Sequence, residues 1–299
     1  MADKETNKKP LRLSNLLVLA SKPAMKCLQE HQPKLNSEFY TNLSIIAIMN
    51  EKLDLLYPLS TDFSMLDYEC AYIPGNAVRM NYKYVPRPNK TFATAVIQRG
   101  WRRFGNYYFH PICHSCNACK SIRINVADFC YSKSQKKAIK RNEETQIIVQ
   151  KPTLTPSHIT LYNKYHRFKH DKDGWKHRDI AQREYYENFV EGAHDFGKEV
   201  LYIKDGKLIG VDLIDILDDG ISAIYFYYDP DYANLSLGTY SLLYQIKLAK
   251  ILDLPWIYLG YWVEGCKAFA YKPNFQPQQI LDGFPDIKQV PDWEQTQHL

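Results

Sequence analysis

The chain has 299 residues, of which 45% are hydrophobic, and a formal net charge of +5. At roughly 150 residues per domain, this length predicts two domains. The apolar run at Leu16–Ala20 is too short for a signal-peptide core or a membrane span, so we expect a cytoplasmic protein with no membrane partner. Seven cysteines, an odd number, argue against a disulfide framework and for free thiols, a metal or a cluster.

Composition divides the chain into four parts. Residues 1–66 mix short apolar runs with Lys, Asn and Pro and are interpreted as an appended N-terminal segment with some helix. Residues 67–150 hold most of the cysteines and a basic stretch, and we expect them to form an N-terminal domain. Residues 151–285 are expected to form the second domain, and residues 286–299 a tail.

Arginine and aromatic residues alternate between residues 99 and 108, where the sequence reads RGWRRFGNYY. A guanidinium group can bind a carboxylate or a phosphate with two parallel hydrogen bonds, and aromatic rings can stack on unpaired bases. Arg102 and Arg103 are therefore candidates for binding an anion. The same residue types also suit a protein core or an ordinary surface, so this alternative stays open.

Three cysteines, Cys113, Cys116 and Cys119, follow at three-residue intervals. A CxxC pair can place two sulfur atoms on one tetrahedral metal, and the overlapping pairs here offer three ligands. Cys70 is the candidate for the fourth ligand, with His114 as the alternative. We predict zinc or an iron–sulfur cluster at this site; reduced or packed thiols are the alternative. The remaining cysteines are expected to be small buried residues: Cys27, Cys130 and Cys266.

The stretch 130–142 contains basic side chains and no acidic one, and their spacing of three and four residues gathers most of them on one helix face: Lys133, Lys136, Lys137, Lys140 and Arg141. Such a face suits a phosphate backbone. The alternative is an ordinary solvated surface.

The second half of the chain has the clearest periodicity. Residues 152–196 are helical in pattern, with apolar and aromatic side chains three and four positions apart. In the segment 199–217, two strand-like runs flank Asp205-Gly206, which is a strong signal for a β-hairpin.

A strand is expected next, at residues 221–230, ending at Asp229-Pro230. The stretch 236–252 predicts a helix with Leu242, Ile246, Ala249 and Leu252 on one face, and residues 255–262 predict a short buried strand. This order resembles that of the acetyltransferase-like (GNAT) fold, so the fold class expected is α+β.

In such a fold, the loop before the helix presents backbone N–H groups to a phosphate or an acyl-bearing group. The candidate residues in this loop are Ser236, Gly238 and Thr239. The alternative is a simple helix N-cap at Ser236 or Thr239.

The chain also resembles the aminoacyl-tRNA protein transferase family, and most closely its bacterial aspartate/glutamate leucyltransferase branch. The resemblance runs from Asp67 to Leu281 and leaves residues 1–66 uncovered. Its motifs are CAYIPG, GWRRFGNYYFHPIC, SKSQKKAIKRN, YYDPDYANLSLGTYSLL and YLGYWVEGCKAFAYKPNFQP.

The resemblance implies transfer of an aminoacyl group from a charged tRNA, leucyl-tRNA in this branch, to proteins that begin with Asp or Glu. It also implies a GNAT-like catalytic domain, a metal or cluster on the cysteines and a part in degradation. The pattern departs from the eukaryotic relatives at Ile73, which stands where they have a second early cysteine. No coenzyme A is expected.

An aminoacyl ester is already activated, so the enzyme must align the attacking amine, accept its proton and stabilise the oxyanion. Asp229 is the candidate base and Tyr261 the second candidate. Arg102 or Arg103 is expected to bind the acceptor's carboxylate. Further candidates for this cation are Arg79, Arg99 and Lys272.

Three alternatives remain at this point. The first is an arginyl-tRNA protein transferase of the same family. The second is a non-catalytic tRNA-binding module with a zinc knuckle, and the third is a small-molecule N-acetyltransferase that uses acetyl-CoA.

Overall fold

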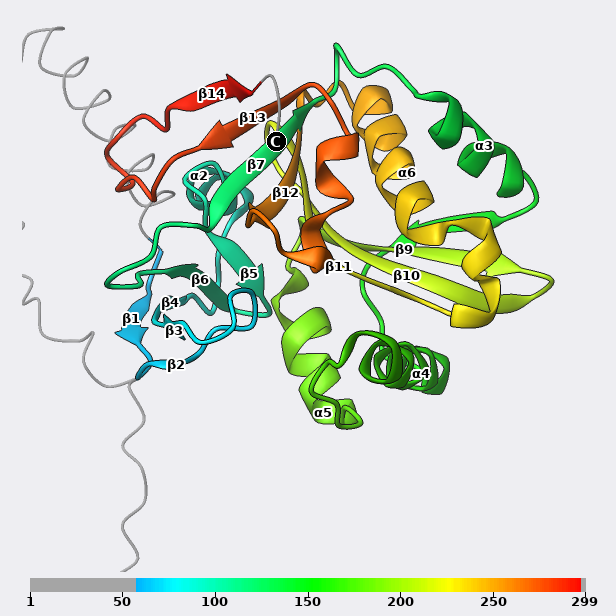
Figure 1. Cartoon of the computed structure of the whole chain (residues 1–299), viewed down its shortest axis with the longest axis horizontal. Coiled ribbons are helices and arrows are strands. Elements are labelled where there is room, and N and C mark those ends of the chain that lie inside the picture. Colours follow the sequence, from blue (N-terminus) through cyan, green and yellow to red (C-terminus); the bar gives the residue numbers. More distant parts are fainter. Residues whose placement is uncertain (1–57, 297–299) are drawn as a thin grey trace, which may run out of the picture. The chain divides into compact units, whose positions relative to one another are not determined.

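A computed structural model describes residues 58–296 of the chain, and these residues belong to one compact unit (Figure 1). The expectations for residues 1–57, including the buried position of Cys27, lie outside the described residues.

The largest sheet has eight strands in the order β14-β13-β7-β12-β11-β10-β9-β8. Their bounds, in chain order, are β7 (Lys120–Asn125), β8 (Gln146–Gln150), β9 (Gly197–Lys204), β10 (Lys207–Ile216), β11 (Gly220–Tyr228), β12 (Trp256–Trp262), β13 (Gln278–Leu281) and β14 (Trp293–Thr296). Strands β7 and β8 come from the expected N-terminal domain. The sheet therefore crosses the boundary expected at residue 150.

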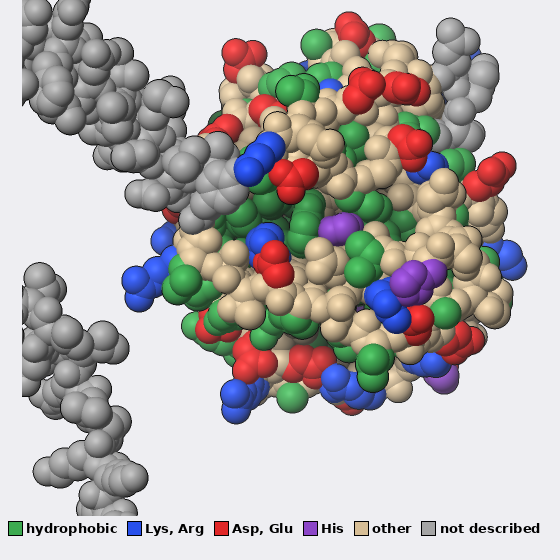
Figure 2. All heavy atoms as spheres, turned by 90° about the vertical axis from the view of Figure 1, so that its left-hand side faces the viewer, with side chains coloured by type: hydrophobic (Ala, Val, Ile, Leu, Met, Phe, Trp, Pro, Cys, Tyr) green, Lys and Arg blue, Asp and Glu red, His purple; other side chains and the backbone are tan. Residues whose placement is uncertain are grey.

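A second sheet of four strands has the order β1-β4-β6-β5, and two short strands pair beside it. The bounds are β1 (Thr61–Ser64), β2 (Tyr68–Glu69), β3 (Ala77–Val78), β4 (Met80–Tyr84), β5 (Arg102–Phe104) and β6 (Tyr107–Pro111). On the face of the molecule drawn in Figure 2, acidic and basic side chains are interspersed with exposed hydrophobic side chains.

Helices cover both faces of the large sheet. They are α2 (Lys90–Ile97), α3 (Lys133–Arg141), α4 (Pro156–Asp173), α5 (Gln182–Tyr185) and α6 (Leu237–Ile251), with short helical turns at η2 (Tyr186–Val190), η3 (Glu191–Ala193), η4 (Pro230–Leu235), η5 (Lys267–Phe269) and η6 (Lys272–Asn274). Figure 1 shows α3 and α6 on one side of the sheet and α4 and α5 on the other. The mixture of sheets and helices confirms the α+β class.

The core lies mainly between the large sheet and α6. Ile122 of β7, Ile214 of β10 and Ile257 of β12 are fully buried there together with Ile246 of α6. The opposite face of the sheet packs Val211 and other apolar residues against α4 and α5. A strand that packs on both faces needs apolar side chains throughout, which explains the near-continuous apolar runs of β10 and β12.

The hairpin predicted at Asp205-Gly206 is confirmed, because β9 and β10 pair antiparallel on either side of it. Both turn residues have positive φ, 51° at Asp205 and 74° at Gly206, as a tight two-residue turn requires. The strand predicted to end at Asp229 is also confirmed as β11. One position in the helix prediction is wrong: α6 ends at Ile251, and Leu252 is its C-cap and is 43% exposed.

Strands β11 and β12 form a parallel pair, but the pairing is short. It joins Gly220 to Trp256 and ends with Ser222 opposite Tyr258. On its other side, β12 has a bulge between Tyr258 and Gly260 where it pairs with β7. The two parallel strands therefore separate at the middle of the sheet, and the predicted anion-binding residues lie near this point.

Candidate functional site

A cavity of about 480 Å³ lies between the small sheet and the end of β12. Its lining combines aromatic, aliphatic and thiol side chains, and the residues relevant to the site are Cys70, Tyr72, Met80, Phe104, Phe109, Cys116 and Tyr261. No charged side chain is among the described residues that line it. The cavity is thus suited to an apolar group of modest size.

The four predicted cysteine ligands all line this cavity, so the structure brings Cys70 to the later three. Burial, and to a smaller degree the neighbouring thiols of Cys70, Cys113 and Cys116, raise the pKa of Cys119 to about 12. Cys266 also contributes to this shift and is half-buried rather than fully buried. Cys130 is exposed, so its predicted burial is wrong.

These thiols do not form a ligand set in their present arrangement. Within residues 58–296, no group of three or more His, Cys, Asp or Glu side chains could hold a metal ion. Zinc or an iron–sulfur cluster at the four cysteines stays a prediction, which metal analysis of anaerobically purified protein would test.

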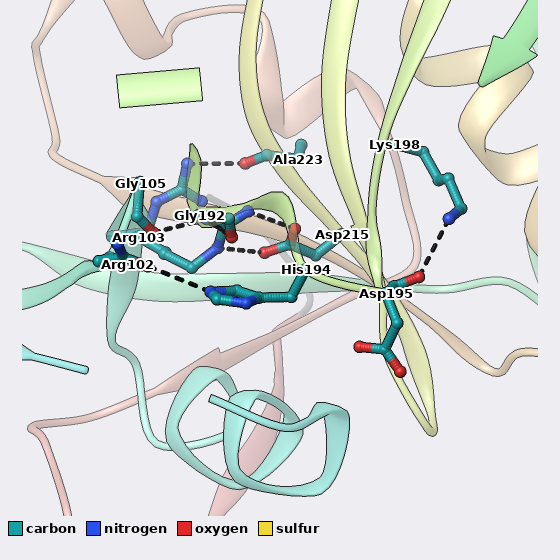
Figure 3. Close-up of polar contacts among 10 residues, drawn as sticks. Arg102, Arg103, Gly105, Gly192, His194, Asp195, Lys198, Asp215 and Ala223 are labelled. Carbon is teal, nitrogen blue, oxygen red and sulfur yellow. Dashed lines mark hydrogen bonds and ion pairs between the residues drawn. The ribbon is translucent and has the colours of Figure 1, made fainter. Parts of the chain in front are cut away.

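Arg103 is fully committed to the protein's own structure. Its guanidinium donates to both carboxylate oxygens of Asp215, at 2.6 and 2.8 Å, and both side chains are buried. It also donates to the backbone oxygens of Gly105 and Gly192, at 2.7 and 2.6 Å (Figure 3). Asp215 raises the pKa of Arg103 against the opposing effect of burial. These bonds leave Arg103 no role in binding an acceptor.

Arg102, the preceding residue of β5, points the other way, because successive side chains of a strand alternate between its two faces. Its Nη2 donates to the backbone oxygen of Ala223 at 2.7 Å (Figure 3) and to that of Ile224 at 3.2 Å. Its Nη1 is buried and has no hydrogen-bond partner in the described part of the chain. Burial lowers the pKa of Arg102, and the acid Asp215 opposes this only weakly.

Tyr261 lines the cavity beside Arg102 and donates a hydrogen bond to the Phe109 oxygen at 3.1 Å. Burial raises its pKa well above 10, so its hydroxyl stays protonated and can donate a proton or a hydrogen bond, but cannot act as a base at neutral pH. Tyr261 thus lies where a reacting group could be, in a different role from a general base.

Asp229, the other catalytic candidate, is not among the residues that line the cavity. Its two carboxylate oxygens accept from Lys164, in a very short contact, and from Lys207, at 2.7 Å. These two lysines lower the pKa of Asp229 although its burial raises it. Asp229 also caps the turn η4 by accepting from the Asp231 amide at 3.1 Å. The geometry therefore indicates a structural clamp at the end of β11.

The basic stretch forms helix α3, as predicted, with a capping box between Ser132 and Gln135. Its basic side chains are all exposed, namely Lys133, Lys136, Lys137, Lys140 and Arg141. Apart from Arg141, none of them forms an ion pair or a side-chain hydrogen bond in residues 58–296. Arg141 donates to Asn234 and Ser236, both at 3.2 Å.

The contact between Arg141 and Ser236 brings α3 to the start of α6. Ser236 precedes the helix in a left-handed conformation, with φ 57°. At Gly238 an added methyl group would meet only Phe226, at 4.0 Å, so the space above this first turn is open. Thr239 lies one residue further along the same turn. Two separately predicted phosphate-binding features thus lie side by side.

Comparison with known proteins shows the family of the chain. Residues 68–137 match the family described as "Arginine-tRNA-protein transferase, N terminus", and residues 157–282 match its C-terminal counterpart. An "Aspartate/glutamate leucyltransferase" of Campylobacter jejuni is 42% identical over 229 residues, which cover 77% of this chain and 96% of that protein. The chain belongs to this transferase family.

Other transferases with the same name support this assignment. That of Helicobacter hepaticus is 42% identical over 75% of this chain and 93% of its own length, and that of Chromohalobacter salexigens is 34% identical over 77% and 93%. Membership of this family confirms the prediction that the protein is an aminoacyltransferase. Among solved structures, L-PGS from Bacillus licheniformis reaches a TM-score of 0.36 at 11% identity, covering 48% of this chain and 45% of that one, which is too low to support a conclusion.

Sequence reasoning missed two features of this transferase. Asp212 is buried in β10 and accepts from Gln245 at 2.8 Å, and burial raises its pKa to about 7. Gly260 has φ 70°, and a methyl group there would lie 2.1 Å from Arg102 Nη1. A glycine inside the strand-like run YLGYW is the only sequence signal for this close approach.

Proposed function

We propose that this protein transfers leucine from leucyl-tRNA to the N-terminal amine of proteins that begin with Asp or Glu, and so marks them for degradation. The family and the names of its relatives support this activity. The observation that carries the choice of leucine is the uncharged cavity beside Tyr261. A leucyl side chain can be buried among apolar groups, whereas an arginyl side chain would need an acid there.

The reaction needs neither a nucleophilic side chain nor a strong base from the protein. The aminoacyl ester is activated already, and an α-amine titrates near pH 8, so part of it is in its reactive form. The main tasks are alignment of the amine and the ester and stabilisation of the oxyanion. The hydroxyl of Tyr261 stays protonated, and it would donate its single hydrogen bond to such an oxyanion by releasing the Phe109 oxygen to which it now donates.

We further propose that the tRNA phosphates contact α3 and the first turn of α6. The exposed cations of α3, together with Ser236, Gly238 and Thr239, are the residues for this contact. The order of the β9–β10 hairpin, β11, α6 and β12 is that expected of a GNAT-like catalytic half. The parting of β11 from β12 then provides the cleft for the reacting groups.

The test is to supply one labelled donor at a time: leucyl-tRNA, arginyl-tRNA or acetyl-CoA. The acceptors are peptides that differ only in beginning with Asp, Glu or Asn. We expect label on the Asp and Glu peptides from leucyl-tRNA only. If only arginyl-tRNA transfers label, the donor is arginine and not leucine. If none of the three donors transfers label, the alternative of a non-catalytic tRNA-binding module is favoured.

The chain contains no membrane-crossing candidate in its described part, where no helix is both long enough and apolar enough. The cytoplasmic location expected from the sequence remains a proposal. Fractionation of cells that express the tagged full chain would test it.

A further inference from the structure

Two cations lie where β11 and β12 separate, one bonded to each strand. Arg102 donates to the Ala223 and Ile224 oxygens of β11, just beyond the last paired residue, Ser222. Lys272, from the turn η6, donates to the Leu259 oxygen of β12 at 2.9 Å and, in a very short contact, to the Tyr261 oxygen. Carbonyl groups two residues apart in a strand point to the same edge, so Lys272 bonds an edge of β12 that β11 has left.

The two cations lie close to each other, because Arg102 packs on Gly260 of β12 and Lys272 bonds the carbonyl oxygens of the two residues that flank this glycine, Leu259 and Tyr261. Arg102 lowers the pKa of Lys272, which burial has already lowered well below its ordinary value. Tyr261 interacts electrostatically with Arg102, as does Tyr72, and both tyrosines line the cavity. The pair therefore lies next to two residues of the cavity wall, although neither cation lines the cavity itself.

This positive charge is not compensated by an acid. In the part of the chain that the structure describes, neither Arg102 nor Lys272 forms an ion pair with a carboxylate. The acid that acts on Arg102, Asp215, has both oxygens bonded to Arg103. Lys272 is only 4% exposed, and buried charges without an opposite charge are costly.

Each of the two cations also has an N–H group that forms no hydrogen bond within residues 58–296. Nη1 of Arg102 is buried without a partner, and an ammonium has three N–H groups, of which Lys272 uses two. The glycine at position 260 lets the guanidinium pack directly on the strand, because a methyl group there would lie 2.1 Å from Nη1. The site thus places two basic side chains with unused N–H donors together, and a bound carboxylate would stabilise the charge of both.

We propose that Arg102 and Lys272 together bind the side-chain carboxylate of the acceptor's N-terminal Asp or Glu. This inference rests on the proposed function, because it names the part of the acceptor that the site recognises. An Asn or Gln acceptor places an NH2 group against the same N–H donors, so the cations stay unsatisfied and the amide is rejected. The tRNA phosphates have the exposed face of α3 available, which favours the carboxylate as the occupant of the buried pair.

The experiment compares acceptor peptides beginning with Asp and Asn, using the full chain and its Arg102→Gln and Lys272→Met variants. The matched control is Arg123→Gln, since Arg123 is another arginine with a pKa lowered by burial and lies against Trp256, away from the cavity lining. Two quantities are measured: the ratio of kcat/KM for Asp over Asn acceptors, and the binding of each peptide to the protein without tRNA.

We expect each variant to lower the Asp-over-Asn ratio roughly ten- to a hundredfold while leucyl-tRNA binding is kept. The control should keep the parent's ratio. An unchanged ratio in both variants would overturn the inference. If a variant loses leucyl-tRNA binding but keeps the parent's Asp-over-Asn ratio, the pair binds a phosphate of the tRNA. That result would also overturn the inference.

The binding measurement separates this inference from the proposed function. If the parent transfers no leucine but binds Asp peptides better than Asn peptides, and Arg102→Gln removes that preference, the site stands and the donor assignment fails. If the variants do not fold, a crystal structure of the parent with an Asp peptide decides. The carboxylate should then lie about 3 Å from Nη1 of Arg102, and a carboxylate bound elsewhere would overturn the inference.

Discussion

Two neighbouring residues of strand β5 differ in whether their guanidinium groups have an acidic partner. Arg102 and Arg103 are adjacent in sequence, yet Arg103 is held by Asp215 and Arg102 keeps an unpartnered nitrogen. Alternation along a strand could have predicted that they face different sides. Alternation could not have shown which of the two arginines forms an ion pair. The partner, Asp215, lies in β10, more than a hundred residues away in sequence.

The buried pair of Arg103 and Asp215 yields a prediction about stability. Arg103→Met should lower the free energy of unfolding by about 3–5 kcal/mol, since it leaves the Asp215 carboxylate buried without a partner. The double variant Arg103→Met/Asp215→Leu should recover most of that loss. Urea unfolding of the three proteins measures it.

An exposed pair supplies the control for this experiment. Arg183 and Glu187 lie four residues apart on the surface, with 2.7 Å between their charged groups, and breaking this pair should lower the free energy of unfolding far less than breaking the buried pair. Equal effects at the buried and the exposed pair would contradict our account of Arg103.

Asp212 yields a prediction about pH. Burial raises its pKa from 3.8 to about 7, so between these values the folded chain holds a proton that the unfolded chain has released. The free energy of unfolding therefore falls as the pH rises through this window, by up to about 1.4 kcal/mol per pH unit from this group, and the contribution is constant above it.

The comparison is with Asp212→Asn, which cannot ionise and keeps the hydrogen bond from Gln245. The variant should be close to the parent in stability near pH 4 and more stable at pH 8. Urea unfolding at a series of pH values measures the difference. Parallel curves for the two proteins would show that Asp212 is not buried in the way described.

At the scale of elements, the contact that we propose between helix α3 and tRNA yields a prediction. Replacing Lys136, Lys137 and Lys140 by Gln should weaken leucyl-tRNA binding and reduce the slope of log K against log salt by up to about one unit per lost phosphate contact. Binding titrations at several salt concentrations give this slope.

The control replaces Lys151, Lys176 and Lys288, which are exposed lysines outside α3, by Gln. It removes the same net charge and should change the slope much less. If both triple variants lower the slope equally, the effect comes from net charge and α3 is an ordinary solvated helix.

Local signals predicted most of the elements in the second half. The Asp205-Gly206 turn, the strand that ends at Asp229 and the face of α6 containing Leu242 and Ile246 all follow from short-range pattern. The exception, Leu252, shows that periodicity does not mark where a helix ends.

At the scale of the whole molecule, the assembly of the large sheet was not predictable from pattern. The insertion of strand β7 between β12 and β13 joins segments that are far apart in sequence. Asp229 was a candidate base because it ends a strand near the expected cleft, and the lysines that clamp it come from α4 and β10. Long-range neighbours decide such roles, and residue spacing does not report them.

The same scale explains why the site lies where it does. The cavity lining comes from the small sheet, the cysteine loop and β12, and the anion-binding pair lies where β11 and β12 part. The proposed donor pocket, acceptor cations and tRNA face thus come from different segments around one sheet. We propose that the uncharged lining selects the aminoacyl group, and the choice of donor is the claim on which the account depends most.

The most direct test offers the protein a choice. The purified full chain is incubated with a complete pool of aminoacylated tRNAs and a peptide that begins with Asp, and the product is sequenced by mass spectrometry. We predict one added leucine at the N-terminus, and no product from the matching Asn peptide. Addition of arginine, or addition to both peptides alike, would contradict the account.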